Sequence, residues 1–109
     1  MLNGLIGKGA LVANKYQDLQ LTGADPGYPL QTTIKLINTN PVACIVSVYL
    51  TQQNATSPSN GDSVYNQYTI NANESLLIET IAMSSDEGIL LLSSASNVNY
   101  YVTGVQSPA

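Results

Sequence analysis

The feature that most constrains this fold is a regular succession of short apolar runs separated by turn residues. From Thr32 onward, segments rich in Ile, Val, Leu, Tyr and Thr alternate with clusters of Asn, Ser, Gly and Pro. Strand-length runs that recur about every 8–12 residues are typical of β-sandwiches, in which each strand crosses the domain once and then turns. The sequence therefore predicts an all-β fold, an antiparallel β-sandwich that is Ig-like or jelly-roll-like, with about six to eight strands.

The strands are predicted from alternation and residue type. Alternate positions between 42 and 52 are apolar, as in a strand with one buried face. Residues 74–83 contain good helix formers, but Ile78, Thr80 and Ile81 are β-branched and the neighbouring segments are strands, so a strand is favoured. The predicted strands cover residues 32–39, 42–52, 63–70, 74–83, 88–94 and 97–105, with two shorter candidates at 10–13 and 18–22.

The first 31 residues differ in character from the rest. They are rich in glycine and end in a turn that contains Asp25-Pro26-Gly27, where Pro fixes φ and Gly tolerates positive φ. We predict one domain, in which residues 1–31 form an extended Gly-rich N-terminal arm with short strands and residues 32–109 form the sandwich core. Glycine lets a backbone lie close to a partner, so we expect the part of the arm around Gly4 to Asn14 to cross neighbouring subunits. We expect removal of residues 1–14 to abolish assembly and leave the sandwich folded.

The composition argues against several classes of function. The chain has no His, which is the commonest general acid–base and metal ligand near neutral pH. Its net charge is −4 with only three basic residues, too few for the basic face that nucleic-acid binding requires. No apolar run approaches the ~20 residues that span a bilayer. We therefore expect no enzymatic activity, no cofactor, no bound metal, no nucleic-acid partner and no membrane partner.

Three groups of residues could carry chemistry. The segment from Gly4 to Gly9 resembles a phosphate loop, but its glycine spacing is too short and no hydroxyl residue follows the lysine. Asp62, Asp86 and Glu87 leave a calcium site open, since Ca²⁺ prefers oxygen ligands, although no local ligand string is present. The single cysteine, Cys44, lies in an apolar run, which predicts a buried, unreactive thiol.

The predicted surface is poor in charge. Soluble domains carry about 25% charged residues, against 9% in this chain. Few charges leave little electrostatic resistance to association, so this surface suits a protein packed into an assembly.

Tyr is enriched at interfaces, and adjacent Tyr100 and Tyr101 should point to opposite sides of a strand. The residues expected at an interface are Leu5, Ile6, Leu11, Val12, Tyr16, Tyr28, Tyr65 and Tyr101.

The order and style of three segments resemble a known group of proteins. The segments are GLIGKGALVAN, TIKLINTNPVACIVSVYL and NANESLLIETIAMSSDEGILLLSSASNVNYYVTGVQ. Together they resemble small structural proteins of tailed bacteriophages, particularly marine and cyanobacterial phages. The resemblance implies a β-sandwich protein of the virion.

Two roles in the virion follow from this resemblance. The first is a capsid decoration (cement) protein that stabilises the head through its N-terminal arm and sandwich contacts. Its partners would be the major capsid protein and further copies of itself, with a trimer favoured. The alternative is a tail, neck or baseplate/fibre component with carbohydrate-binding loops around Tyr65, Asn66 and Tyr68.

Overall fold

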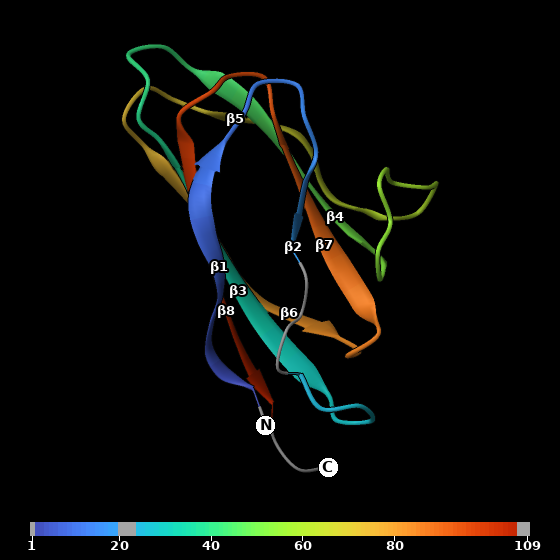
Figure 1. Ribbon diagram of the computed structural model, residues 1–109. Coiled ribbons are helices and arrows are strands. Elements are labelled where there is room, and N and C mark those ends of the chain that lie inside the picture. Colours follow the sequence, from blue (N-terminus) through green and yellow to red (C-terminus); the bar gives the residue numbers. More distant parts are fainter. Residues whose placement is uncertain (1, 20–23, 107–109) are drawn as a thin grey trace.

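The protein is built from strands joined by turns and loops (Figure 1). The structure, a computed structural model, describes residues 2–19 and 24–106, and no residue in these two ranges is helical. The strands are β1 (Asn3–Leu11), β2 (Gln17–Leu19), β3 (Leu30–Asn38), β4 (Cys44–Gln52), β5 (Ser63–Ile70), β6 (Ser75–Met83), β7 (Glu87–Ser93) and β8 (Val98–Gln106).

The strands form two antiparallel sheets of four strands each. The first sheet has the order β1-β8-β3-β6, and the second sheet has the order β2-β7-β4-β5. The strands pair as in one long antiparallel ribbon wrapped into two layers. The pairs are β1 with β8, β2 with β7, β3 with β6 and β4 with β5. The prediction of an all-β protein with antiparallel sheets is confirmed.

The core lies between the two sheets and is formed by alternate residues of each strand. In β3, the alternate residues Leu30, Thr32, Ile34 and Leu36 are fully buried, while Gln31, Thr33 and Lys35 between them are exposed or partly covered. Cys44 of β4 is also buried, and this burial raises the pKa of its thiol. The prediction of a buried thiol is confirmed.

Most strands lie where the sequence predicts them. The segment 74–83, for which a helix was the competing prediction, forms β6, with Ile78 opposite Ile34 of β3. The candidate at 10–13 is largely wrong, because only Ala10 and Leu11 belong to a strand and they end the longer β1. Of the candidate at 18–22, the first two residues lie in β2 and the other three lie outside the described residues.

The predicted Gly-rich arm is not confirmed, because its residues form strand β1. This strand pairs with β8 from Asn3 opposite Val105 to Leu11 opposite Val98. Its glycines make room for large side chains: a Cβ atom at Gly9 would lie 2.9 Å from the Tyr100 hydroxyl. The missing side chains therefore let Tyr100 cover this edge strand, an arrangement that compensates for glycine in sheets.

A buried asparagine ties together two turns at one end of the sandwich. Asn38 ends β3 and is 0% exposed. Its amide nitrogen lies 2.9, 3.1 and 3.2 Å from the carbonyl oxygens of Val42, Ile70 and Asn71. Its amide oxygen accepts a hydrogen bond of 3.0 Å from the backbone nitrogen of Asn40. One side chain thus links the β3–β4 turn to the β5–β6 turn.

Candidate functional site

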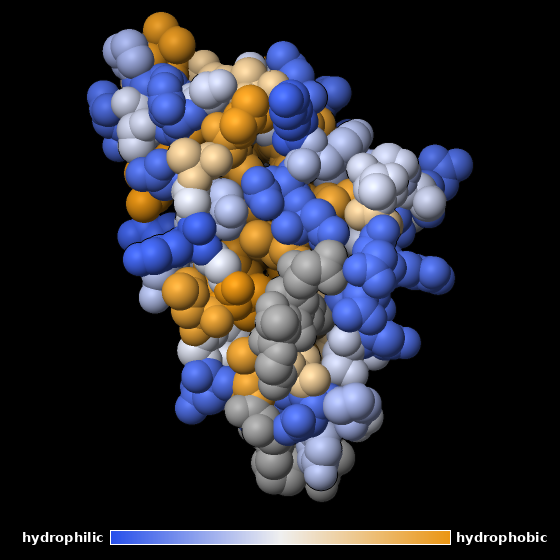
Figure 2. Space-filling model, in the orientation of Figure 1, coloured by the Kyte–Doolittle hydropathy of each residue, from blue (hydrophilic) through white to orange (hydrophobic). Residues whose placement is uncertain are grey.

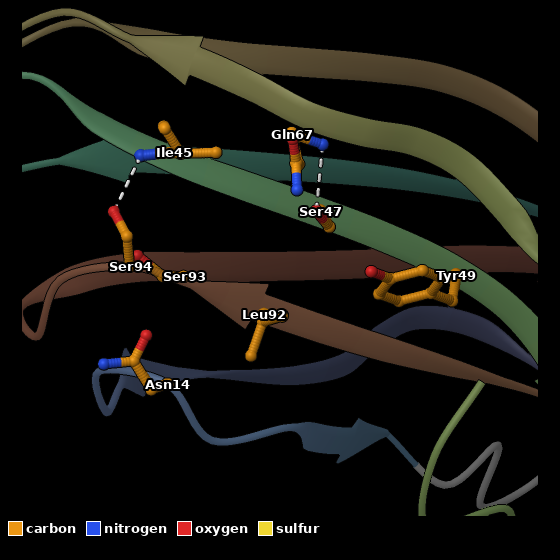
Figure 3. A pocket seen from close by; sticks show the side chains of 8 residues that line it. All are labelled: Asn14, Ile45, Ser47, Tyr49, Gln67, Leu92, Ser93 and Ser94. Atoms are coloured by element: carbon orange, nitrogen blue, oxygen red, sulfur yellow. Dashed lines mark hydrogen bonds between the residues drawn. The ribbon is translucent and has the colours of Figure 1, made fainter.

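The outer face of the second sheet carries a shallow groove of about 290 Å³ (Figure 3). Its floor comes from β4 and β7, and its two sides come from β5 and from the connection between β1 and β2. No lining residue carries a charge. The residues that line the groove are Asn14, Ile45, Ser47, Tyr49, Gln67, Leu92, Ser93 and Ser94.

The alternation of β4 places one row of side chains in the groove. Val46 is buried in the core, so its neighbours Ile45 and Ser47 point outward, as does Tyr49 two positions later. The ring of Tyr49 meets the ring of Tyr16 edge to face, with centroids 6.0 Å apart and planes at 72°. This contact restricts the orientation of Tyr49, which lies at one end of the groove (Figure 3).

A β-bulge turns Gln67 toward the groove. Between two successive register pairs, β5 contains one more residue than β4, which is the definition of a bulge. Gln67 takes up the irregularity with φ of 53°. Its backbone nitrogen donates a hydrogen bond of 3.0 Å to the Ser47 hydroxyl, shown as a dashed line in Figure 3. Ser47 therefore fixes the backbone of the bulge.

Asn14 lies on the opposite side of the groove (Figure 3). Its φ is 60°, and its backbone nitrogen donates a hydrogen bond of 2.8 Å to the carbonyl oxygen of Ser93. Nearby, the Ser94 hydroxyl accepts a hydrogen bond of 2.9 Å from the backbone nitrogen of Ile45. Both sides of the groove are thus held by backbone hydrogen bonds, while its chemistry consists of amides, hydroxyls, one phenol and apolar groups.

Four of the predicted interface residues lie in β1 or in the segment that follows it, on the side of the protein seen in Figure 1, but their side chains do not share one surface. Leu5 faces outward from the first sheet, Ile6 packs against the core, and Tyr16 contacts Tyr49 on the second sheet. Leu5 and Ile6 belong to β1, while Val12 and Tyr16 belong to the connection between β1 and β2. Figure 2 shows hydrophobic side chains along the middle of this side, bordered by hydrophilic ones. Leu11 is a correction, because it is only 1% exposed and packs in the core.

The three remaining tyrosines are not brought together. Tyr28 lies in the loop before β3, and Tyr101 lies on the outer face of the first sheet. Tyr65 packs against the core and contacts Tyr68 edge to face at 5.7 Å. Tyr65, Asn66 and Tyr68 are residues of strand β5, so the loop that was expected to hold them is a strand.

The outer face of the first sheet is a second exposed surface, and the sequence prediction found only part of it. Tyr101 points outward there and Tyr100 inward over Gly9, as predicted. Lys8 and Lys35 are the cross-strand neighbours of Tyr101. The alternation of β6 and β8 could have identified the other outward apolar positions. The large apolar side chains exposed on this face are Leu5, Leu77, Tyr101 and Val105.

The carboxylates considered for calcium stabilise their own turns. Asp62 accepts a hydrogen bond of 2.7 Å from the backbone nitrogen of Ser59, and Glu87 accepts one of 2.8 Å from that of Ser84. The Ser84 hydroxyl donates to Asp86, and this hydrogen bond lowers the pKa of the Asp86 carboxyl. Within residues 2–19 and 24–106, no three His, Cys, Asp or Glu side chains are grouped so as to hold a metal ion.

Comparison with known proteins adds no relative. No family model, no curated protein and no solved structure matches the chain. Nor does any helix among the described residues have the length and apolarity to cross a membrane. The function is therefore argued from the surfaces described above and from the sequence resemblance.

Proposed function

We propose that this chain is a non-enzymatic structural protein of a bacteriophage virion, a capsid decoration protein that packs on the head through the outer face of its first sheet. The observation that carries the proposal is the exposure of four large apolar side chains on this one face. Soluble monomers rarely leave such side chains grouped on a single surface. Leu5, Leu77, Tyr101 and Val105 are 48%, 51%, 47% and 48% exposed.

The charge on this face also suits a protein partner. Every outward residue of the central strand β8 is uncharged. Lys8 and Lys35, two of the three basic residues of the chain, flank Tyr101 across the sheet. The exposed Tyr101 at the centre of this face is typical of protein interfaces, where Tyr is enriched. The two lysines beside it would face acidic groups of the partner.

The strand order supports a jelly-roll form of the sandwich. Pairing of the first strand with the last, and of each following strand with its counterpart from the other end, is what two linked Greek keys produce in an eight-stranded double sheet. Jelly rolls are found in viral capsid and lectin domains. Because a fold does not by itself imply a function, this support adds to the surface argument and to the phage resemblance.

The structure changes how such a protein would attach. Residues 3–11 are strand β1 of the first sheet, so they are not free to reach across neighbouring subunits. Contacts are proposed instead through the sheet face and through the free edge of β1, which pairs only with β8 among the described strands. Free strand edges carry backbone groups that can pair with another chain.

A pair of matched variants tests this surface. Leu77→Glu places a carboxylate on the proposed contact face, and Val42→Glu places one on the β3–β4 turn, where Val42 is 65% exposed. Each variant is mixed with capsids that lack the protein and is sedimented. We expect Leu77→Glu to lose binding and Val42→Glu to keep it. Full occupancy by Leu77→Glu, with folding verified by circular dichroism, contradicts the proposed face.

The alternative location in the virion is a tail, neck or baseplate. Cryo-electron microscopy of the particle separates the two, since density on the capsid faces supports decoration and density confined to the tail supports the alternative. The major capsid protein and further copies of the chain, with a trimer favoured, remain the proposed partners. Sedimentation equilibrium of the purified chain measures whether it associates with itself as a trimer.

A further inference from the structure

We propose that the groove on the outer face of the second sheet binds a neutral carbohydrate. This site lies on the opposite side of the sandwich from the face proposed to contact the capsid, so both surfaces can act in one particle. The inference does not depend on the virion role. It rests on the uncharged lining, the apolar floor and the unpaired side-chain amides of the groove.

The lack of charge restricts the class of ligand. All eight lining residues are neutral, and placing a ligand charge against them without a counter-charge would be costly. The groove is equally unsuited to a purely hydrocarbon ligand, because serine hydroxyls and two amides border it. A ligand with both apolar C–H faces and many uncharged hydroxyls fits this lining, and sugars have that character.

The floor offers an apolar platform. Ile45 and Tyr49 of β4 and Leu92 of β7 contribute apolar surface, with Tyr49 at one end of the groove (Figure 3), and the contact with Tyr16 holds its ring. A ring with restricted motion binds a flat apolar face with little loss of side-chain entropy. The volume of about 290 Å³ is just below the ~300–1,000 Å³ found for small-molecule sites, which favours a small saccharide.

Two amide side chains supply the polar contacts. In the described part of the chain, no hydrogen bond occupies the side-chain amide of Asn14 or of Gln67. Each amide has an acceptor oxygen beside donor hydrogens, which matches two adjacent sugar hydroxyls. Their backbones are fixed by Ser93 and Ser47, so both amides project from held positions on opposite sides of the groove (Figure 3).

The backbone at Gln67 is strained in a way that indicates function. Positive φ values are tolerated by Gly and, among other residues, mainly by Asn and Asp. In the described chain, each non-glycine residue with positive φ is Asn except Gln67, at 53°. Strained positions cluster at ligand sites, where the strain serves to aim a side chain. Gly at this position would relieve the strain but would remove the amide.

The test is a titration of the ¹⁵N-labelled full-length chain with neutral methyl glycosides of glucose, galactose, mannose and N-acetylglucosamine. Glucuronate serves as the charged counterpart of glucose. We expect at least one neutral glycoside to shift the amide resonances of Ser47, Gln67 and Leu92 saturably, with a Kd on the order of 1 mM. We expect weaker binding of glucuronate than of methyl glucoside.

Matched variants separate binding from stability. Gln67→Gly should bind the glycoside about fivefold more weakly while its Tm rises, because the strain is relieved. Asn54→Gly relieves positive φ (65°) in the loop between β4 and β5, away from the groove, and should leave sugar binding unchanged.

Three results would overturn the proposal. These are no saturable shift with any of the four neutral glycosides, shifts located outside the groove, or undiminished binding by Gln67→Gly. Capsid binding by Gln67→Gly is a separate readout of the proposed virion role. It is expected to equal that of the native chain, so each proposal can fail without the other.

Discussion

Replacing Asn38 with Asp tests how one end of the sandwich is closed. The two side chains have the same shape, but a carboxylate has no hydrogen to donate. Asn38→Asp would place a negative oxygen where the amide nitrogen now lies 2.9 to 3.2 Å from three carbonyl oxygens. The perturbation therefore changes charge and hydrogen bonding at a fully buried position without changing volume.

The expected cost follows from two limiting cases. If the new carboxyl stays ionised, the buried carbonyl of Ile70 and the part-buried carbonyls of Val42 and Asn71 lose their donor. Each buried acceptor left without a donor costs about 1–3 kcal/mol, and charge repulsion adds to this. If it takes up a proton, it can donate one hydrogen bond, but protonation at pH 7 of a group with an ordinary pKa near 3.9 costs about 4 kcal/mol. We expect a loss of about 4 kcal/mol at pH 7, which is a large part of the ~5–15 kcal/mol stability of a domain.

The loss of stability caused by Asn38→Asp should grow with pH. Burial and the facing carbonyls raise the pKa of the new carboxyl in the folded state above its value in the unfolded chain. The variant is then least destabilised below the unfolded pKa, and the loss grows as the pH rises through the folded pKa. At pH 4 we expect the loss to shrink by about 2 kcal/mol or more.

The assay is urea unfolding followed by far-UV circular dichroism at pH 7 and pH 4. Asn99→Asp, at an exposed position of β8, makes the same change in charge and should stay within about 0.5 kcal/mol of the native chain. A cost for Asn38→Asp below about 1 kcal/mol, or one that does not change with pH, would refute the role assigned to Asn38.

Two further predictions concern β1 and the buried thiol. Gly9→Val should destabilise the protein by about 1–3 kcal/mol, because a Cβ atom there would lie 2.9 Å from the Tyr100 hydroxyl. Ala10→Val, at the next and exposed position, should change thermal stability by less than about 0.5 kcal/mol, and equal effects would contradict the packing described. Burial raises the pKa of Cys44 above 9.0, so the unfolded chain ionises first and this contribution to stability is lost as the pH rises above 9.0. Cys44→Ala should remove that part of the decline in urea midpoints between about pH 8 and pH 10, and an unchanged decline would show that the thiol does not contribute.

The strands could be predicted because alternation is a local property. Apolar and polar residues alternate within residues 32–39, and turn residues follow residues 63–70. These two segments form β3 and β5. The role of β1 could not be predicted in the same way. Whether Gly9 is a flexible link or a gap for another side chain depends on Tyr100, which is distant in sequence and adjacent only in the sheet.

The groove was beyond prediction for a related reason. The sequence places Ile45, Ser47 and Tyr49 on one side of a strand, but the partners of that side are set by the pairing with β7 and β5. The bulge that turns Gln67 to the groove is an irregularity of register between two strands. Neither the neighbours nor the irregularity follows from the period of a single segment.

The position of β8 has a consequence for how the protein is made. This strand lies inside the first sheet, between β1 and β3, so the first sheet stays incomplete until residues 98–106 have been synthesised. Domains that depend on contacts between distant segments fold slowly, on the scale of about milliseconds to seconds. During that interval β1 and β3 have open edges that can pair with another chain. Pairing by β8 is therefore the step that closes both edges and limits pairing between incomplete chains.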